Sequence, residues 1–494
     1  MNIIFQKAKN GEDTALVENL YLHSAYNPQK EADRFVENLQ PPFQPEIIII
    51  TEPALSYVAL PLKNKFPTCK IACIRYVADF EKYNKDFDFV LNFFENPRDF
   101  ANALLQKLGE EKLLTTFFCS WEPSSKVFSE QNKKVWQAIK KAIENAKTLL
   151  ITRQYFEKKW LINSFNFFSY LKNPLKLTRK IRHPIFIIAS GRSLETYLQA
   201  IKKSQDKVFI ICLSSAIKAC LENGIKPDLC LSTDGGYWAG QHLKILTSKN
   251  IPLALVSESY CPKKILKNND ILPLKYGDEV IKIENSDFLL AKRNGTISGT
   301  ALEFALDYSE SESEIFFFGL DLASQKGFQH CQPNELEINA ATKDNRIKND
   351  QTRATRSQFS TASFEIYKNW FKNFDLKERK VYRVINEDFK HNSLGQIKDI
   401  SGDDFNDLIS QFQKNENKDY LENNPQQGGK MAEKAKKSLS SFLQNDFFTE
   451  KTKKQLYPLE YILLKHEPSN REIKNRIEKN HNDLYEKLRG IIDG

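Results

Sequence analysis

Short apolar runs alternate with segments of helical periodicity in the middle of the chain. Three runs predict buried strands at Ile185–Ala189, Val208–Leu213 and Leu229–Ser232, and small polar residues follow each of them. Repeated strand–loop–helix units of this kind are typical of an open parallel α/β sheet. Ligands bind at the carboxyl ends of the strands in such sheets, where helix N-termini offer free N–H groups and a partial positive charge to a phosphate.

Further strands are expected on both sides of this stretch. The central sheet should also contain Pro252–Val256, Glu314–Gly319 and a strand near Val381–Ile385. The apolar runs of the N-terminal region predict a second, smaller Rossmann-like sheet. Its expected strands are Glu46–Thr51, Lys70–Ile74, Phe87–Leu91 and Leu113–Phe118.

The loop after the first of these N-terminal strands reads Thr51-Glu52-Pro53-Ala54. It contains no glycine, and a proline hinders the close backbone approach that a phosphate needs. We therefore expect the N-terminal domain to bind no nucleotide and to serve in packing or in docking a protein partner.

Composition and periodicity divide the chain into five parts. Residues 151–180 are basic and aromatic, residues 411–436 are polar and turn-rich, and residues 437–494 are rich in Lys and Glu with helical spacing. The prediction is an α/β protein with a Rossmann-like central sheet, a smaller α/β N-terminal domain and a helical C-terminal domain. The expected parts are the N-terminal domain (1–150), a helical connector (151–180), the central domain (181–410), a linker (411–436) and the C-terminal domain (437–494).

The composition favours a folded protein of a reducing compartment. The 494 residues include 35 Phe and 18 Tyr, which suits two or three cores, and the net charge of +9 fits a lysine-rich surface. No zinc-finger spacing, RNA-binding aromatic pattern or arginine-rich arm indicates nucleic acid. The eight cysteines form no CxxC pair, the N-terminus becomes charged too early for a signal peptide, and no apolar run is long enough for a membrane span. We expect free thiols and a cytoplasmic location.

The polar loops after the three central strands carry the first candidate ligand-binding residues. A glycine turn at a helix N-terminus brings N–H groups towards a ligand, and a serine can cap the helix while facing it. An ordinary helix start has the same composition, so the turn alone leaves both interpretations open. The candidates are Gly191, Arg192, Ser193, Ser214, Ser215 and Asp234.

A second candidate segment precedes a predicted apolar helix. Thr296, Ser298, Gly299 and Thr300 offer N–H and O–H donors to an anion. A glycine turn with an N-cap residue would have the same sequence.

Asp321 and His330 follow the predicted strand that ends at Gly319. A loop histidine can act as a general base because its free pKa is close to neutrality. A surface histidine without a function is the alternative. No HExxH, clustered-histidine or DxD pattern indicates a metal, and neither a Walker A motif nor a G-x-S-x-G motif is present.

Several of these segments resemble the motility-associated factor (Maf) family in their order and spacing. The resemblance covers roughly residues 20 to 400. The central domain of that family is shared with 6-hydroxymethylpterin pyrophosphokinase-like proteins and is similar to bacterial sialyltransferases. The matching blocks are LHSAYNPQKEADRFVENL, IASGRSLETYL, SSAIKACLENGIKPDLCLSTD, RNGTISGTALEFAL and FFFGLDLASQKGFQH.

The resemblance implies a cytoplasmic glycosyltransferase with a sialyltransferase-like central catalytic domain. It would move a nonulosonic acid, of the pseudaminic or legionaminic type, from a CMP-activated donor to Ser or Thr of flagellin, in support of flagellar assembly and motility. Flagellin and the CMP-sugar would be its partners. No nucleic acid, membrane, metal or further cofactor is expected.

The family's motifs also imply roles for the candidate residues. The turn near the nucleotide falls on Gly191, Arg192 and Ser193, with Arg192 in place of the usual proline. The helix start from Ser298 to Thr300 matches the segment near the CMP phosphate. The motif that ends in Gly327 and His330 supplies the catalytic residues, and either His330 or Asp321 would accept the proton of the acceptor hydroxyl.

Two other functions stay open. A pterin-type pyrophosphokinase that uses ATP and Mg²⁺ shares the central domain, although it would have little use for the flanking domains. A non-catalytic flagellin-binding protein would fit the substitution at Arg192 and the N-terminal loop without glycine.

Overall fold

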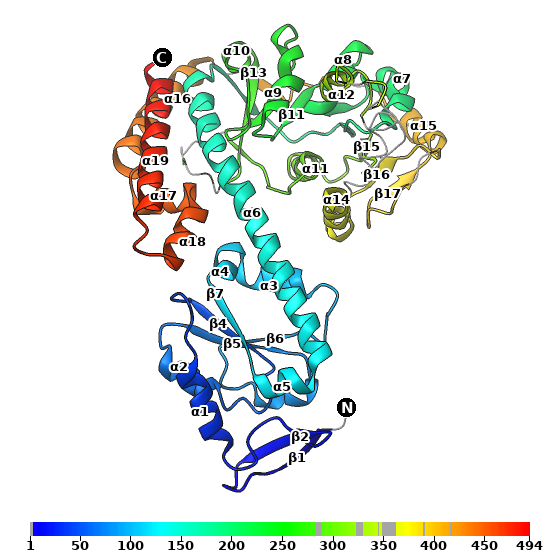
Figure 1. Ribbon diagram of the computed structural model, residues 1–494. Coiled ribbons are helices and arrows are strands. Elements are labelled where there is room, and N and C mark those ends of the chain that lie inside the picture. The colour runs from blue at the N-terminus through cyan, green and yellow to red at the C-terminus, as the bar shows by residue number, and fades with distance from the viewer. Residues whose placement is uncertain are drawn as a thin grey trace. The chain divides into compact units, whose positions relative to one another are not determined.

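The chain divides by its contacts into two compact units. The first is Met1–Glu157 with Thr449–Asp483, and the second is Lys158–Phe448 with Leu484–Gly494. Figure 1 shows both, and helix α6 (Ser129–Tyr170) contributes residues to each. The computed structural model describes residues 3–277, 279, 281, 288–322, 330–343, 345–347, 362–388, 391–414, 417–423 and 425–494.

A four-stranded parallel sheet forms the centre of the first unit, in the order β6–β5–β4–β7. Every residue of β4 is buried, because its run of isoleucines is covered by helices on both faces. The strands are β4 (Ile47–Thr51), β5 (Lys70–Arg75), β6 (Phe89–Asn92) and β7 (Thr116–Ser120). The strand expected at Leu113–Phe118 begins at Thr116 because helix α4 extends to Leu114.

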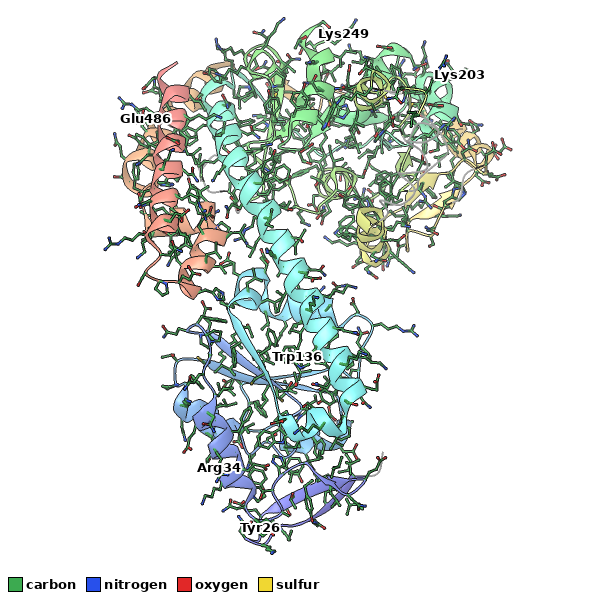
Figure 2. All side chains as sticks on the ribbon, viewed as in Figure 1. Tyr26, Arg34, Trp136, Lys203, Lys249 and Glu486 are labelled. Atoms are coloured by element: carbon green, nitrogen blue, oxygen red, sulfur yellow. The ribbon has the colours of Figure 1, made fainter. Side chains whose placement is uncertain are left out.

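Helices cover both faces of this sheet. Val36 and Leu62 pack against one face and Leu104 and Ile139 against the other. Trp136 of α6, which is labelled in Figure 2, donates its indole N–H to Ser120 Oγ, 2.8 Å away at the end of β7. The helices of the first unit are α1 (Pro28–Asn38), α2 (Ala59–Lys65), η1 (Ala78–Tyr83), α3 (Phe100–Leu108), α4 (Glu110–Leu114), α5 (Glu122–Val127), α17 (Glu450–Leu456), α18 (Pro458–His466) and most of α19 (Arg471–Asp493). A small antiparallel sheet contains β1 (Ile3–Lys7), β2 (Asp13–Val17) and β3 (Leu20–Tyr21).

A buried ion pair fills the carboxyl end of β4. Arg75 Nη1 donates to Glu52 Oε1 at 2.8 Å, and both side chains are fully buried. The other carboxylate oxygen accepts the N–H groups of Tyr76 and Val77 at 2.8 and 2.9 Å. Glu52 adopts a positive φ of 37°, a strained conformation that this network holds in place. The chain's own charges therefore occupy the position where a nucleotide-binding Rossmann unit would hold a phosphate.

The second unit contains an eleven-stranded sheet. Its order is β17–β16–β15–β9–β10–β11–β12–β13–β8–β18, with β14 beside β13, and β18 is the antiparallel strand. All of the strands predicted for the central sheet form. The strands are β8 (Asn173–Leu177), β9 (Ile185–Ile188), β10 (Phe209–Leu213), β11 (Leu229–Ser232), β12 (Leu253–Val256), β13 (Asp270–Lys275), β14 (Leu289–Leu290), β15 (Ile315–Phe318), β16 (Val381–Val384), β17 (Lys398–Ile400) and β18 (Leu421–Asn423).

The strand order reverses at β9. The chain runs from β9 through β10 to β13 on one side and then returns to β15 on the other side of β9. The loops after β9 and β15 therefore depart in different directions, and the crevice between them is the usual ligand position in such sheets.

Helices also cover both faces of the central sheet. Ala301 and Leu302 of α11 belong to the same buried cluster as Ile187 and Ile211. Phe405 of α15 lies among the aromatic rings of the strands. The helices are α7 (Leu194–Ser204), η2 (Ser214–Ala216), α8 (Ile217–Glu222), α9 (Tyr237–Leu243), η3 (Lys244–Thr247), α10 (Lys263–Asn268), α11 (Ile297–Tyr308), α12 (Glu335–Ala341), α14 (Ala362–Asn373), α15 (Gly402–Ser410), α16 (Pro425–Ser441) and the π-helix η4 (Phe442–Asp446). The predicted α/β fold with a parallel central sheet, a smaller α/β region and C-terminal helices is confirmed.

Segments near the expected domain boundaries have more structure than the sequence indicated. The connector predicted as helical over 151–180 is helical to Tyr170 and then forms β8, where Leu175 and Leu177 alternate with Lys176. The linker predicted over 411–436 contains β18, which pairs with β8, and the start of α16. Both strands depend on a partner that is far away in the sequence, so local composition does not reveal them.

The C-terminal helices are shared between the two units. Thr449–Asp483 belongs with the first unit, whereas α16, η4 and Leu484–Gly494 belong with the second. The prediction of a single domain over 437–494 rests on the Lys- and Glu-rich helical pattern that this whole segment shares.

All eight cysteines are free thiols, and all but Cys69 are buried. Among the residues that the structure describes, no helix is both long and apolar enough to cross a membrane.

Candidate functional site

The turn after β9 lies directly against the end of β15. The Gly191 N–H donates to the Gly319 carbonyl at 2.9 Å. A Cβ on Gly191 would lie 2.3 Å from that oxygen and 2.6 Å from Asp321 Oδ2, and Gly319 has a φ of +67°. Both positions therefore require glycine, the first for close approach and the second for its backbone conformation.

Asp321 ties the two loops together. Its Oδ2 accepts the Ser193 N–H at 2.9 Å, and its Oδ1 accepts the Ser193 hydroxyl. The next residue, Leu322, has a φ of +46°, so the backbone is strained at this point. Because both carboxylate oxygens of Asp321 hold the turn at Ser193, the geometry favours a positioning role for Asp321 over that of a proton acceptor.

His330 also lies beside the turn at Gly191. It forms an isolated antiparallel bridge with Gly191, and the following N–H of Cys331 donates to the Ser190 carbonyl at 2.8 Å. The imidazole Nδ1 lies 3.1 Å from Glu337 Oε1, and Glu337 on α12 is 7% exposed. A buried carboxylate at Nδ1 favours the proton on that nitrogen and leaves Nε2 as the basic one.

The sequence analysis did not identify Glu337. It lies on α12, seven residues after His330, and nothing in the local sequence pattern distinguishes it from the partly exposed Glu335 of the same helix. The useful signal would have been Asn334, which caps α12 by accepting the Leu336 N–H at 3.0 Å. A helix that starts directly after the His330 loop places its first turns back towards that loop.

Ser215, after β10, is bound into the same network. Its hydroxyl donates to Ser190 Oγ at 2.9 Å, and its carbonyl accepts the Asn334 side-chain amide at 2.9 Å. The neighbouring Ser214 is 5% exposed. The loops after β9 and β10 and the start of α12 are therefore one connected structure.

The start of α11 supplies one of the expected donors to this region. Ser298 is near the helix N-terminus, where the positive end of the helix dipole favours an anion. Thr300 instead donates its hydroxyl to the Lys292 carbonyl at 2.9 Å, and a Cβ on Gly299 would lie 2.9 Å from the Trp370 ring. The N–H groups of both residues donate to the carbonyl of the N-cap residue Thr296. Gly299 and Thr300 thus make structural contacts, which fit the alternative interpretation of this segment as a glycine turn at a helix start.

A cavity of about 130 Å³ lies where these elements meet. Its walls come from the ends of β9, β10 and β15, from the start of α11 and from α14. The candidate residues that line it are Gly191, Ser215, Ser298, Asp321 and His330. The candidates that do not line it are Arg192, Ser193, Ser214, Asp234, Thr296, Gly299 and Thr300. Gly327 lies outside the described residues.

Asp234 is exposed after β11, where its Oδ1 accepts the Gly236 N–H at 2.9 Å. A second histidine lies near this loop on α9. Burial lowers the pKa of His242, electrostatic interaction with His330 lowers it further, and Glu335 and Asp234 raise it. His242, His330 and Asp234 are therefore electrostatic neighbours, and the sequence analysis did not identify His242. In the part of the chain that the structure describes, no three His, Cys, Asp or Glu side chains are placed to hold a metal ion.

Comparisons with known proteins bear on the second unit and on the whole chain. Residues 158–327 match the family model described as 6-hydroxymethylpterin diphosphokinase MptE-like. The whole fold is similar to that of the MAf glycosyltransferase from Magnetospirillum magneticum AMB-1, with a TM-score of 0.50 and 11% identity over 99% of this chain and 90% of that chain. The resemblance that the sequence motifs indicated is thus confirmed for the fold and for the central domain.

Two uncharacterized proteins of Treponema pallidum (strain Nichols) are also similar in sequence. One is 28% identical over 317 residues, which are 63% of this chain and 69% of the relative. The other is 21% identical over 362 residues, which are 66% of this chain and 60% of the relative. The chain thus matches under two thirds of the second relative's length.

Proposed function

We propose that the chain is a glycosyltransferase that moves a nonulosonic acid from a CMP-activated donor to a Ser or Thr hydroxyl of flagellin, in the cytoplasm. The observation that carries the proposal is the His330–Glu337 pair beside the donor-lined cavity at the switch point of the sheet. The Maf-like fold and the sequence motifs support the choice of substrates.

In this proposal the reaction is an inverting displacement. His330 Nε2 accepts the proton of the acceptor hydroxyl, and Glu337 stabilises the imidazolium that forms. The acceptor oxygen forms a bond to the anomeric carbon of the sugar as the bond from that carbon to the phosphate oxygen breaks. The electron pair of the broken bond leaves with CMP.

The leaving group sets the second requirement. CMP departs as a phosphate monoester, so the site has to stabilise negative charge at the phosphate. Ser298 at the α11 N-terminus and Ser190 after β9 are the side chains placed to donate hydrogen bonds there, and Ser215 orients the Ser190 hydroxyl by donating to it at 2.9 Å. In this proposal Asp321 and Ser193 hold the turn that brings the Gly191 backbone to the nucleotide.

Two experiments test the proposal. The intact mass of flagellin from cells with and without the gene should differ by one or more nonulosonic acid residues. In thermal shift assays, CMP and CTP should stabilise the purified chain more than ATP does, with or without Mg²⁺. An unchanged flagellin mass would contradict the proposed reaction.

The match of residues 158–327 to a pterin diphosphokinase-like family favours a pyrophosphokinase as the second candidate. That enzyme would transfer a diphosphoryl group from ATP to the hydroxymethyl group of a pterin. Stabilisation that is selective for ATP and depends on Mg²⁺ would support it. Flagellin binding without any nucleotide binding would instead support a non-catalytic partner.

A further inference from the structure

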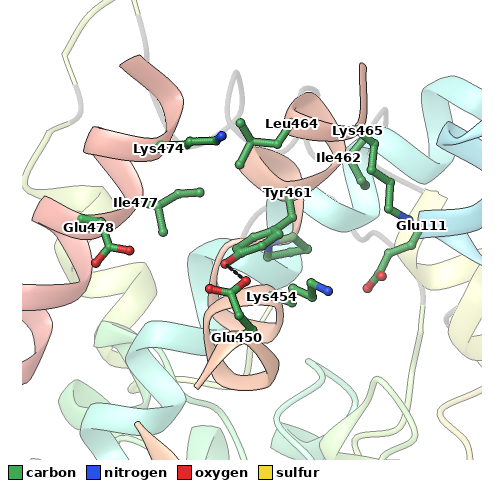
Figure 3. A pocket seen from close by; sticks show the side chains of 11 residues that line it. Glu111, Glu450, Lys454, Tyr461, Ile462, Leu464, Lys465, Lys474, Ile477 and Glu478 are labelled. Atoms are coloured by element: carbon green, nitrogen blue, oxygen red, sulfur yellow. Dashed lines mark hydrogen bonds between the residues drawn. The ribbon is translucent and has the colours of Figure 1, made fainter. Parts of the chain in front are cut away.

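A cavity of about 490 Å³ lies among α4, α17, α18 and α19 of the first unit (Figure 3). The proposed reaction uses none of its lining residues. Three glutamates and three lysines line it, so its formal charge is zero, and it indicates no particular class of charged ligand. These residues are Glu111, Glu450, Glu478, Lys454, Lys465 and Lys474.

Three aromatic side chains lie at the carboxyl edge of the central sheet, outside the cavity that the proposed reaction uses. Tyr237 and Trp238 begin α9, which is labelled in Figure 1, and their rings lie 5.4 Å apart. Tyr260 lies in the loop after β12. Tyr237 is 59% exposed and Tyr260 is 39% exposed. These three residues are termed the aromatic platform.

A glycine of α9 brings the two tyrosines together. A Cβ on Gly240 would lie 2.2 Å from Tyr260 Cε1, so the Tyr260 ring lies directly on the helix. Gly240 is three residues after Tyr237 and therefore on the same helix face, which places the Tyr260 ring beside Tyr237. A glycine inside a helix costs about 0.5–1 kcal/mol relative to alanine. The helix thus loses some stability and gains a pair of adjacent, exposed tyrosines.

The loops that carry the platform are fixed by backbone contacts. The Tyr260 N–H donates to the Asp234 carbonyl at 3.0 Å, which joins the loop after β12 to the loop after β11. The side-chain amide of the buried Asn163 donates to the carbonyls of Gly235 and Glu258 at 3.1 and 2.9 Å. A surface that is ordered in advance binds a partner with a smaller loss of conformational entropy.

The strand register places the platform next to the cavity. Leu213 of β10 lines the cavity and pairs with Leu231 of β11, three residues before Asp234. Neighbouring strands lie about 4.8 Å apart, so the loop after β11 begins one strand away from the cavity and the loop after β12 follows it. His242, which is also on α9, is an electrostatic neighbour of His330. A molecule that covers the platform therefore extends to the cavity.

We infer that the aromatic platform binds the acceptor polypeptide and holds its Ser or Thr residue at the cavity. This inference rests on the proposed function, and it assigns a docking surface to the acceptor. Tyrosine and tryptophan contribute much of the binding energy of protein interfaces, because they bury a large area and lose little conformational freedom. The matching part of the acceptor has apolar side chains close to the hydroxyl that is modified.

Charge distinguishes this occupant from the sugar of the donor. The exposed Asp234 lies three residues before Tyr237. A CMP-activated nonulosonic acid carries a carboxylate and a phosphate, and the Asp234 carboxylate would repel both. A neutral or basic acceptor segment meets no such repulsion.

The test measures the binding of the full chain to unmodified flagellin, purified from cells without the gene. Tyr237→Ala should raise the Kd for flagellin, and the KM for flagellin in the transfer assay, roughly tenfold. The Kd for CMP should stay the same, and this unchanged value also shows that the variant is folded.

Gly240→Ala is a second test, in which all three aromatic side chains are kept. Alanine favours the helix, but its Cβ would displace the Tyr260 ring. This variant should weaken flagellin binding in the same way as Tyr237→Ala. Phe448→Ala is the matched control, because Phe448 is a 45% exposed aromatic residue of the second unit outside the platform, and it should bind flagellin like the wild type.

Four outcomes would overturn the inference. They are no flagellin binding by the wild type, unchanged flagellin binding in Tyr237→Ala and Gly240→Ala, an equal loss in Phe448→Ala, and a raised KM for the donor in place of that for flagellin. If the wild type transfers the sugar while the platform variants bind flagellin normally, the proposed function stands and the docking surface is wrong. If the wild type transfers no sugar but binds flagellin through Tyr237, the docking surface stands and the proposed reaction is wrong.

Discussion

In the first unit the loop after β4 closes over a buried Glu52–Arg75 pair, whereas in the second unit the loops after β9 and β15 surround a cavity. All of these loops follow buried parallel strands. The same strand–loop arrangement therefore leads to a filled strand end in the first unit and to a cavity in the second. The difference lies in the residues that follow each strand. Gly191 and Gly319 allow two loops to meet with their polar groups facing a cavity, but Glu52 extends a side chain into the equivalent space and needs Arg75 to neutralise it. A Rossmann-like sheet thus predicts where a site would be, and the loop residues decide whether the site is open.

The largest effect is expected from His330→Ala. Loss of the general base should lower the rate of transfer by about 10³-fold, whereas CMP should still bind because the hydroxyl donors of Ser190 and Ser298 remain. Transfer would be followed with purified CMP-nonulosonate and flagellin, and CMP binding by calorimetry. A normal transfer rate in this variant would remove His330 from the mechanism.

Arg75→Ala removes the ion pair with Glu52 that fills the carboxyl end of β4. The change leaves the fully buried Glu52 carboxylate without its partner, which should cost about 3–5 kcal/mol. Hydrogen exchange of peptides from β4 and β5 in the full chain would report the loss. Lys63→Ala, which breaks the half-exposed pair with Asp88 in the same unit, is the control and should cost under about 1 kcal/mol. Weaker CMP binding in Arg75→Ala would contradict the view that only the second unit binds the nucleotide.

Glu337→Gln tests the carboxylate behind the proposed base. Gln keeps the shape but provides no negative charge to stabilise the imidazolium, so kcat should fall by roughly 10- to 100-fold with little change in the KM for the donor. Glu335→Gln is the matched control, because Glu335 lies on the same helix and pairs with Lys218 at 2.8 Å. If both variants lose the same activity, the loss reflects damage to α12 and Glu337 has no special role.

How far the sequence predicts this arrangement depends on how local each signal is. The strands of the central sheet were predictable because each is a short apolar run that is buried on both faces. The turn at Gly191 and Asp321 were predictable because they directly follow such strands, and His330 because it belongs to the sequence motif that begins at Gly319. Glu337 and His242 were missed because they lie on helices, where only the folded chain shows which face meets the site. Thr300 was assigned to a ligand on its residue type, although its hydroxyl bonds to a backbone carbonyl.

The smallest effect concerns pH and the filled end of the first sheet. His23 is 1% exposed, its ring lies 5.0 Å from that of Trp121, and its Nε2 accepts the Leu55 N–H at 3.1 Å. Burial lowers the pKa of His23 to about 3, and the charge of Arg75 contributes in the same direction.

Between about pH 6.5 and pH 3 the unfolded chain therefore binds a proton at His23 that the folded chain does not, and the stability of the first unit falls as the pH falls through this window. The loss should reach roughly 2 kcal/mol between pH 6.5 and pH 5. Glu31 Oε2 lies 3.8 Å from His23 Nδ1, and burial raises the pKa of Glu31. Protonation of Glu31 at lower pH therefore favours the folded chain and opposes the destabilisation caused by His23, so the measurement stays above pH 5. Hydrogen exchange of the peptide that contains Leu55 should show this dependence in the wild type and a weaker one in His23→Gln. An equal pH dependence of exchange in the wild type and in His23→Gln would mean that it comes from groups other than His23. This histidine would then not determine the loss of stability of the first unit at low pH.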